Sequence, residues 1–176
     1  MRGLPNRLRL PCASRKQRRH AKFCTPVQSG GGQTIDQAVV DNAHYEAWAK
    51  LLDAEKPDVV FTQWPIDNHP DHRATANLTY NAWVKSKHRF TLYYYEVSDG
   101  MDTLQFSPTH YVDITDQEPI KRAACYAHAS ATPDIFYPLQ DQVALFRGLE
   151  SHYKRAEAFI LQVQSPDDPL QILQKA

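Results

Sequence analysis

The sequence has few cysteines and no long apolar run. Its 176 residues contain only three cysteines, Cys12, Cys24 and Cys125, an odd number at wide spacing and without a C-x-x-C pair. This pattern favours reduced thiols in a cytoplasmic compartment over a disulfide framework or a structural zinc site. No stretch approaches the roughly 18 to 20 apolar residues that a membrane helix needs. We therefore expect a cytoplasmic protein without a membrane span.

Acidic residues are absent from the first 32 positions. Residues 1–22 hold eight of the 20 Lys and Arg, so the remainder holds 12 basic against 20 acidic residues, a net charge of −8. Such a basic head is typical of a nucleic-acid arm or a transit peptide, or it is an extension foreign to the domain. The acidic remainder argues against nucleic acid as the main partner. We interpret 1–32 as a basic, poorly ordered extension, 33–165 as the domain and 166–176 as a tail.

Helical and strand patterns alternate along the domain. The expected helices are 42–55, 70–85, 116–129 and 141–162; the expected strands are 57–63, 89–97 and 109–115. Alternation of this kind predicts an α/β sandwich with a mainly parallel sheet. Binding sites in such sheets lie beyond the carboxyl ends of the strands. The loop 64–71 falls at such an end and is therefore the first place to look for a site.

That loop lies within WPIDNHPDHR, residues 64–73, and is rich in titratable groups. Pro70 suits the first turn of a helix, which places His69 at the cap and His72 in the first turn. Histidines three positions apart at a helix start can point toward one region. The positive end of the helix dipole favours neutral imidazole, the form that binds a metal. The pattern predicts a metal-binding corner, because imidazole nitrogen and carboxylate oxygen are the kinds of atom that ligate a zinc ion.

Simpler interpretations of the neighbouring residues stay open. Asp67 is also a natural loop or N-cap residue, and a histidine taken singly is more often a surface group than a ligand. Asp71 either orients a histidine or favours the helix dipole. Glu96, Asp99 and Asp102 lie at or just past the end of the strand 89–97, on the side where a substrate could lie, and one of them is a candidate to bind it.

A resemblance to a known family makes the prediction of a metal-binding site more specific. Residues 56–83 read KPDVVFTQWPIDNHPDHRATANLTYNAW and resemble the second signature of the LmbE-like, or PIG-L, N-acetylglucosaminyl deacetylases. Three further stretches also agree with the family pattern, namely LYYYEV, THYVDIT, and FRGLE before RAEAF. The similarity therefore covers about residues 33–165. It implies a Rossmann-like three-layer fold and zinc-dependent hydrolysis of an N-acetyl group from an amino sugar or related conjugate. By the same resemblance His72 matches a metal ligand, and His69 matches the histidine that assists the tetrahedral intermediate.

One part of the family pattern is missing. The resemblance implies an HPDD-type motif after a first strand, upstream of residue 33, which supplies two further ligands and the general base. The only similar string is SPDD, 165–168, which lacks the histidine and which we interpret as coincidence. The chain is thus expected to lack the usual first strand–helix unit. It is either a fragment of a deacetylase or an inactive member, the alternative function being non-catalytic binding of a saccharide or a partner protein.

Overall fold

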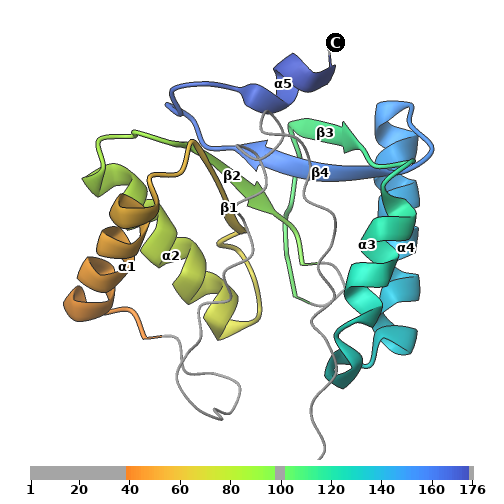
Figure 1. Ribbon diagram of the computed structural model, residues 1–176, viewed down its shortest axis with the longest axis horizontal. Coiled ribbons are helices and arrows are strands. Elements are labelled where there is room, and N and C mark those ends of the chain that lie inside the picture. The colour runs from red at the N-terminus through yellow and green to blue at the C-terminus, as the bar shows by residue number, and fades with distance from the viewer. Residues whose placement is uncertain (1–38, 98–101, 175–176) are drawn as a thin grey trace, which may run out of the picture. The chain divides into compact units, whose positions relative to one another are not determined.

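The computed structural model describes residues 39–97 and 102–174 (Figure 1). The predicted basic head and Asp99 lie outside these residues. In chain order the elements are α1 (Asn42–Glu55), β1 (Val59–Gln63), α2 (Pro70–Lys85), β2 (Thr91–Tyr95), β3 (His110–Asp113), α3 (Glu118–Tyr126), the 3-10 turn η2 (Ala129–Ala131), α4 (Pro133–Ser151), β4 (Ala156–Leu161) and α5 (Pro169–Gln174). No helix among them is long and apolar enough to cross a bilayer.

The four strands form one mixed sheet in the order β1-β2-β4-β3. Only β1 and β2 run parallel, whereas β4 is antiparallel to both of its neighbours. The α/β class is confirmed, but the prediction of a mainly parallel sheet is wrong. The reason is β4, which the sequence analysis assigned to the end of a long helix.

The boundary between α4 and β4 explains this error. Residues 156–161 read AEAFIL, which contains good helix formers, but strand pairing on both sides overrides that local preference. The helix ends at Ser151, and His152 follows with a φ of 64°. The turn then packs against Gly148, where an added Cβ would lie 2.7 Å from the carbonyl oxygen of Tyr153. The chain can reverse here because Gly148 has no side chain.

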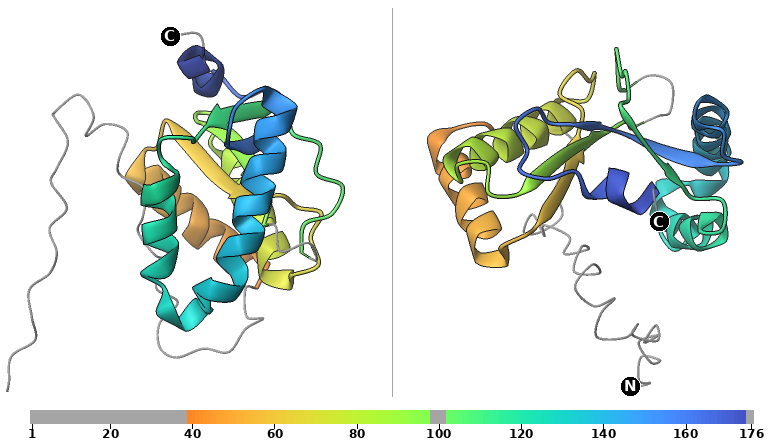
Figure 2. Two further views of the ribbon diagram at one scale, coloured as in Figure 1. Left: turned by 90° about the vertical axis from the view of Figure 1, so that its right-hand side faces the viewer. Right: turned by 90° about the horizontal axis from the view of Figure 1, so that it is seen from above.

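Helices lie beside both halves of the sheet (Figures 1 and 2). The pair α1 and α2 packs beside β1 and β2, and the pair α3 and α4 packs beside β4 and β3. On the α2 side, Trp83, Phe90 and Leu92 are almost fully buried and share one core cluster with Val60 and Tyr94. This packing fixes β1 and α2, the two elements that flank the histidine loop.

The chain after β4, which includes the first residues of the predicted tail 166–176, also contacts the sheet. The backbone N–H of Leu92 donates to the Ser165 hydroxyl at 3.1 Å. The side chain of Asp168 accepts from the hydroxyl of Tyr93 at 2.5 Å and lies 2.8 Å from Nε2 of His110. Asp168 thus ties the chain after β4 to Tyr93 in the middle of β2 and to His110 at the start of β3.

Candidate active site

The site lies where two parallel strands end. Because β1 and β2 are parallel, the loops that follow them leave the same edge of the sheet. The two loops are hydrogen bonded to each other: Leu104 N–H donates to Ile66 O at 2.9 Å, and Asn68 N–H donates to Asp102 O at 2.8 Å. The loop that carries the histidines is thus held against the loop after β2.

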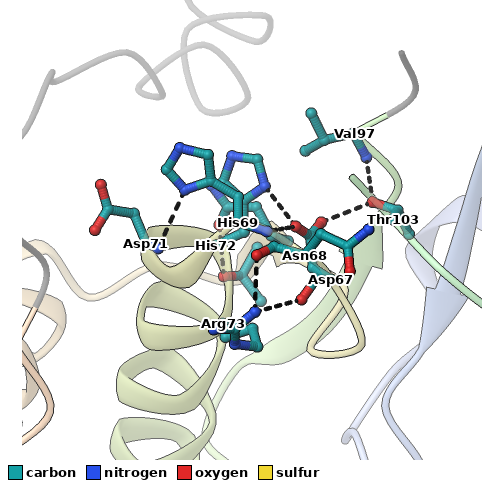
Figure 3. A network of polar contacts seen from close by, with 10 residues as sticks. Asp67, Asn68, His69, Asp71, His72, Arg73, Val97 and Thr103 are labelled. Atoms are coloured by element: carbon teal, nitrogen blue, oxygen red, sulfur yellow. Dashed lines mark hydrogen bonds and ion pairs between the residues drawn. The ribbon is translucent and has the colours of Figure 1, made fainter. Parts of the chain in front are cut away.

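Asp67 organises this edge from a buried position (Figure 3). Its Oδ1 accepts from the backbone N–H of His69 at 2.7 Å and lies 3.0 Å from Nδ1 of His72. Its Oδ2 accepts from the hydroxyl of Thr103 at 2.9 Å. A carboxylate removed from water is costly unless it is paired in this way. Asp67 therefore acts as the internal support of the histidine pair rather than as a simple loop residue.

Two further contacts make the loop rigid. Nη1 of Arg73 donates to the carbonyl oxygens of Asp67 and Asn68 at 2.8 and 2.9 Å. The Thr103 hydroxyl, which donates to Asp67, accepts in turn from the N–H of Val97 at 2.8 Å. The backbone of the histidine loop is thus fixed both from α2 and from the chain after β2.

The bond to Asp67 sets the proton position on His72. An ionised carboxylate only accepts hydrogen bonds, so the Nδ1 that faces Asp67 carries the proton. In the neutral ring, Nε2 then keeps its lone pair. A histidine that binds a metal commonly donates its other N–H to a carboxylate in this manner. His72 is therefore oriented as a metal ligand would be, which its sequence position alone did not show.

His69 has the opposite arrangement. It is the N-cap of α2, and its Nδ1 accepts from the backbone N–H of Asp71 at 3.2 Å. An accepting Nδ1 leaves the proton of the neutral ring on Nε2. The rings of His69 and His72 stack with their centroids 4.5 Å apart and their planes at 23°. The loop thus brings together one imidazole that can donate and one that can accept.

The structure places the other candidates differently. The backbone of Asp71 makes the contact to His69, and its carboxylate lies in the first turn of α2, where the helix dipole favours it. Glu96 forms a two-pronged ion pair with Arg147 at 2.7 and 2.8 Å. This pair raises the pKa of Arg147 above its ordinary value. Both oxygens of Glu96 are thus engaged by Arg147.

A cavity lies beside this ion pair. It has a volume of about 570 Å³ and is lined by aromatic and aliphatic side chains of the sheet and α4, with two ion pairs at its wall. The pairs are Glu96–Arg147 and Lys121–Glu157, the latter at 2.7 Å. Phe61, Tyr95 and Phe159 are its aromatic lining residues. The cavity shares Glu96 and Val97 with the chain that supports Asp67, so it adjoins the candidate site.

The sequence analysis missed Thr103, whose hydroxyl completes the support of Asp67. No local signal marks it, because its partner lies 36 residues earlier and the contact depends on two loops meeting at one sheet edge. Asp67, His69 and His72 were found because they are close in sequence and follow a strand.

The described residues do not form a complete metal site. Among residues 39–97 and 102–174 no group of three or more His, Cys, Asp or Glu side chains could hold a metal ion. His72 offers one imidazole nitrogen, whereas a catalytic zinc ion takes about three protein ligands. The described part of the chain therefore does not fit a zinc ion by itself.

Comparison with known proteins identifies the fold. No protein-family model and no curated protein matches the sequence. Among solved structures, the conserved protein TT1542 from Thermus thermophilus matches with a TM-score of 0.61 and 22% identity over 73% of this chain and 62% of that one. N,N'-diacetylchitobiose deacetylase from Pyrococcus horikoshii matches with a TM-score of 0.57 and 21% identity over 74% and 57%.

A third match is the zinc-inhibited form of teicoplanin deacetylase Orf2, with a TM-score of 0.53 and 15% identity over 80% of this chain and 61% of that one. The chain thus spans about three fifths of the length of these proteins. It shares over most of its own length a fold found in deacetylases, which is the fold that the resemblance to the LmbE-like family implies.

Proposed function

We propose that this chain carries the histidine-bearing half of the active site of a hydrolase that cleaves the C–N bond of an N-acetylated amino sugar or a related conjugate. The observation that carries the proposal is the stacked pair His69 and His72 at the carboxyl edge of β1, with opposite proton positions fixed by their neighbours. The likeness to deacetylase structures supports the reaction class, and the three isolated cysteines support a cytoplasmic location.

The two histidines have separate roles in this proposal. Nε2 of His72, whose ring Asp67 holds in place, would be one ligand of a zinc ion in the complete site. Nε2–H of His69 donates to the oxygen that becomes negatively charged when the amide carbonyl is attacked, the stage at which a fixed donor contributes most. Because hydrogen bonds set both proton positions before substrate binds, neither ring has to reorganise.

The outer edge of β1 is where the remaining part of the active site would pair with the sheet. Trp64 N–H donates to Tyr95 O, so even-numbered positions of β1 face β2 and odd-numbered positions direct their N–H and C=O groups outward. Among the described residues no strand pairs with this outer edge, and Phe61 is 42% exposed. We propose that in the complete protein a further strand–helix unit pairs here and supplies the remaining ligands and the general base.

The proposal is tested first on the gene and then on the protein. A continuous reading frame upstream of and across codons 1–32 that encodes an HPDD-type motif is the expected result. Zinc titration of the protein from that frame should give one site, and His72→Ala should weaken it at least ~10-fold. His44→Ala, a change to an exposed histidine in α1, is the matched control. An unchanged zinc affinity in His72→Ala would overturn the proposal.

A second candidate is a non-catalytic protein that binds a saccharide or another protein. Two observations favour it: the described residues offer no group of three metal ligands, and a cavity of about 570 Å³ adjoins the site. It predicts that the purified chain retains N-acetylglucosamine in equilibrium dialysis with a chelator present and releases no amine from it. Stoichiometric zinc in elemental analysis would contradict this candidate.

A further inference from the structure

Helix α4 carries an exposed apolar stripe that the proposed function does not use. Ile135, Leu139, Phe146 and Leu149 are 63%, 42%, 53% and 76% exposed. With 3.6 residues per turn, these four positions fall within roughly 80° of one another around the helix axis. The only other residue at the centre of the arc is Gln142, which is also exposed. The stripe runs along most of the 19 residues of α4.

The remaining faces of α4 already have a function in the fold. Tyr137, Ala144, Arg147 and Gly148 are buried, and Ala144 and Arg147 also line the cavity. The stripe lies on a different face of the helix from these residues, although the guanidinium of Arg147 lies 5.3 Å from the centre of the Phe146 ring. Its exposure is therefore not explained by the cavity or by packing against the sheet.

The exposed area is large for a surface without a partner. The four side chains expose on the order of 500 Å², near the upper end of the 300–600 Å² typical for the largest apolar patch of a monomer. Covering this patch on two copies would bury roughly 1,000 Å², the lower limit for a specific protein interface. The area is thus sufficient for a dimer of modest affinity, with a Kd on the order of micromolar.

The spacing of the stripe points to a second copy as the partner. Counted from Gln142, the apolar residues lie at −7, −3, +4 and +7, which is nearly symmetric. When two such helices pack antiparallel, Ile135 meets the partner's Leu149, and Leu139 meets the partner's Phe146. Gln142 meets its own counterpart, and an amide can donate to and accept from an identical amide. A surface that complements itself in this way is what a twofold dimer requires.

We propose that the protein forms a homodimer in which two α4 helices pack antiparallel about a twofold axis that passes near Gln142. The register has one unfavourable feature, because Asp134 approaches the partner's Glu150 at each end. Arg147 already binds Glu150 at 2.7 Å, which offsets part of the repulsion. This feature makes the register testable.

The first test is sedimentation equilibrium of the full chain over a concentration series. We expect a monomer–dimer equilibrium, and Phe146→Glu or Leu149→Glu should raise the Kd at least ~30-fold, because each change places two charges in the apolar interface. Val84→Glu is the matched control, a change at an α2 residue that is 45% exposed, and should leave the Kd unchanged. Circular dichroism checks that each variant is folded. A monomer at all concentrations up to ~200 μM, or a dimer insensitive to both stripe variants, overturns the proposal.

The second test addresses the register. Asp134→Lys should tighten the dimer several-fold by turning a repulsion into an attraction, whereas Glu55→Lys on α1 should not. In a background with Cys12, Cys24 and Cys125 changed to serine, Gln142→Cys should form a disulfide-linked dimer under mild oxidation, and Lys85→Cys on α2 should not. A dimer that Asp134→Lys weakens, or that Gln142→Cys does not cross-link, overturns the antiparallel register.

Discussion

The hydroxyl of Thr103 donates to Oδ2 of Asp67 at 2.9 Å across 36 residues of sequence. This bond joins the loop after β2 to the loop after β1 at the edge where the candidate site lies. The opposite oxygen of the same carboxylate faces Nδ1 of His72. The position of the His72 ring therefore depends on a residue far away in the sequence, and both loops have to fold before the site exists.

Thr103→Val should destabilise the protein with little change in side-chain volume. The change removes the hydroxyl that bonds both Asp67 and the N–H of Val97. Leaving buried polar groups without partners costs about 1–3 kcal/mol, so we expect the free energy of unfolding in urea to fall by about this amount. Ser107→Ala, a change at an exposed position, should alter it by less than about 0.5 kcal/mol. Equal stability of the two variants would show that the bond does not support the loop.

The proton positions of the two histidines can be observed directly. Nitrogen-15 NMR at a pH where the rings are neutral should show the proton of His72 on Nδ1 and that of His69 on Nε2. Asp67→Asn should remove the preference at His72, because the amide can present its NH₂ group in place of a carboxylate oxygen. His69 should keep its proton position, since its bond is to the backbone of Asp71. Both rings with their proton on the same nitrogen would contradict the hydrogen bonding of this loop.

What the sequence could predict depends on how local each signal is. His69 and His72 follow a short apolar strand and begin a helix at Pro70, so strand, loop and cap residues are all contiguous. The strand β4 could not be predicted in this way, because its residues favour a helix and only pairing with β2 and β3 makes them a strand. Missing β4 also led to the wrong expectation of a mainly parallel sheet.

The attachment of the C-terminal segment should depend on pH through Asp168. Burial acts to raise the pKa of Asp168, but the hydrogen bonds from Tyr93 and His110 outweigh it, and the pKa lies below its ordinary value. A carboxyl whose pKa is lowered on folding adds stability above its unfolded pKa of about 3.9, and that stability is lost as the pH falls through the folded pKa. We therefore expect part of the acid destabilisation below about pH 4 to come from this residue.

Asp168→Asn tests this assignment. Hydrogen bonds to a charged group contribute about 1.5–3 kcal/mol, so the variant should lose an amount of this order at neutral pH and show a smaller decrease in stability between about pH 5 and 3, a window set by the carboxyl pKa. Asp167→Asn, a change at the exposed neighbour, should keep the wild-type pH dependence. Unfolding free energies from urea titrations at both pH values make the comparison. A wild-type pH slope in Asp168→Asn would rule out this role.

Gly148→Ala should disturb the turn that leads into β4. A Cβ at this position would lie 2.7 Å from the carbonyl oxygen of Tyr153 and 2.9 Å from backbone atoms of Lys154. These are backbone atoms, so the turn itself has to move, and overpacking of this kind costs about 1–3 kcal/mol. We expect the free energy of unfolding in urea to fall by this amount and the amide hydrogens of β4 to exchange faster. Lys50→Ala, an exposed change in α1, should leave both unchanged, because alanine is the better helix former and the position lies in another helix. Full stability of Gly148→Ala would mean that the turn tolerates a side chain and that the end of α4 is determined by other residues.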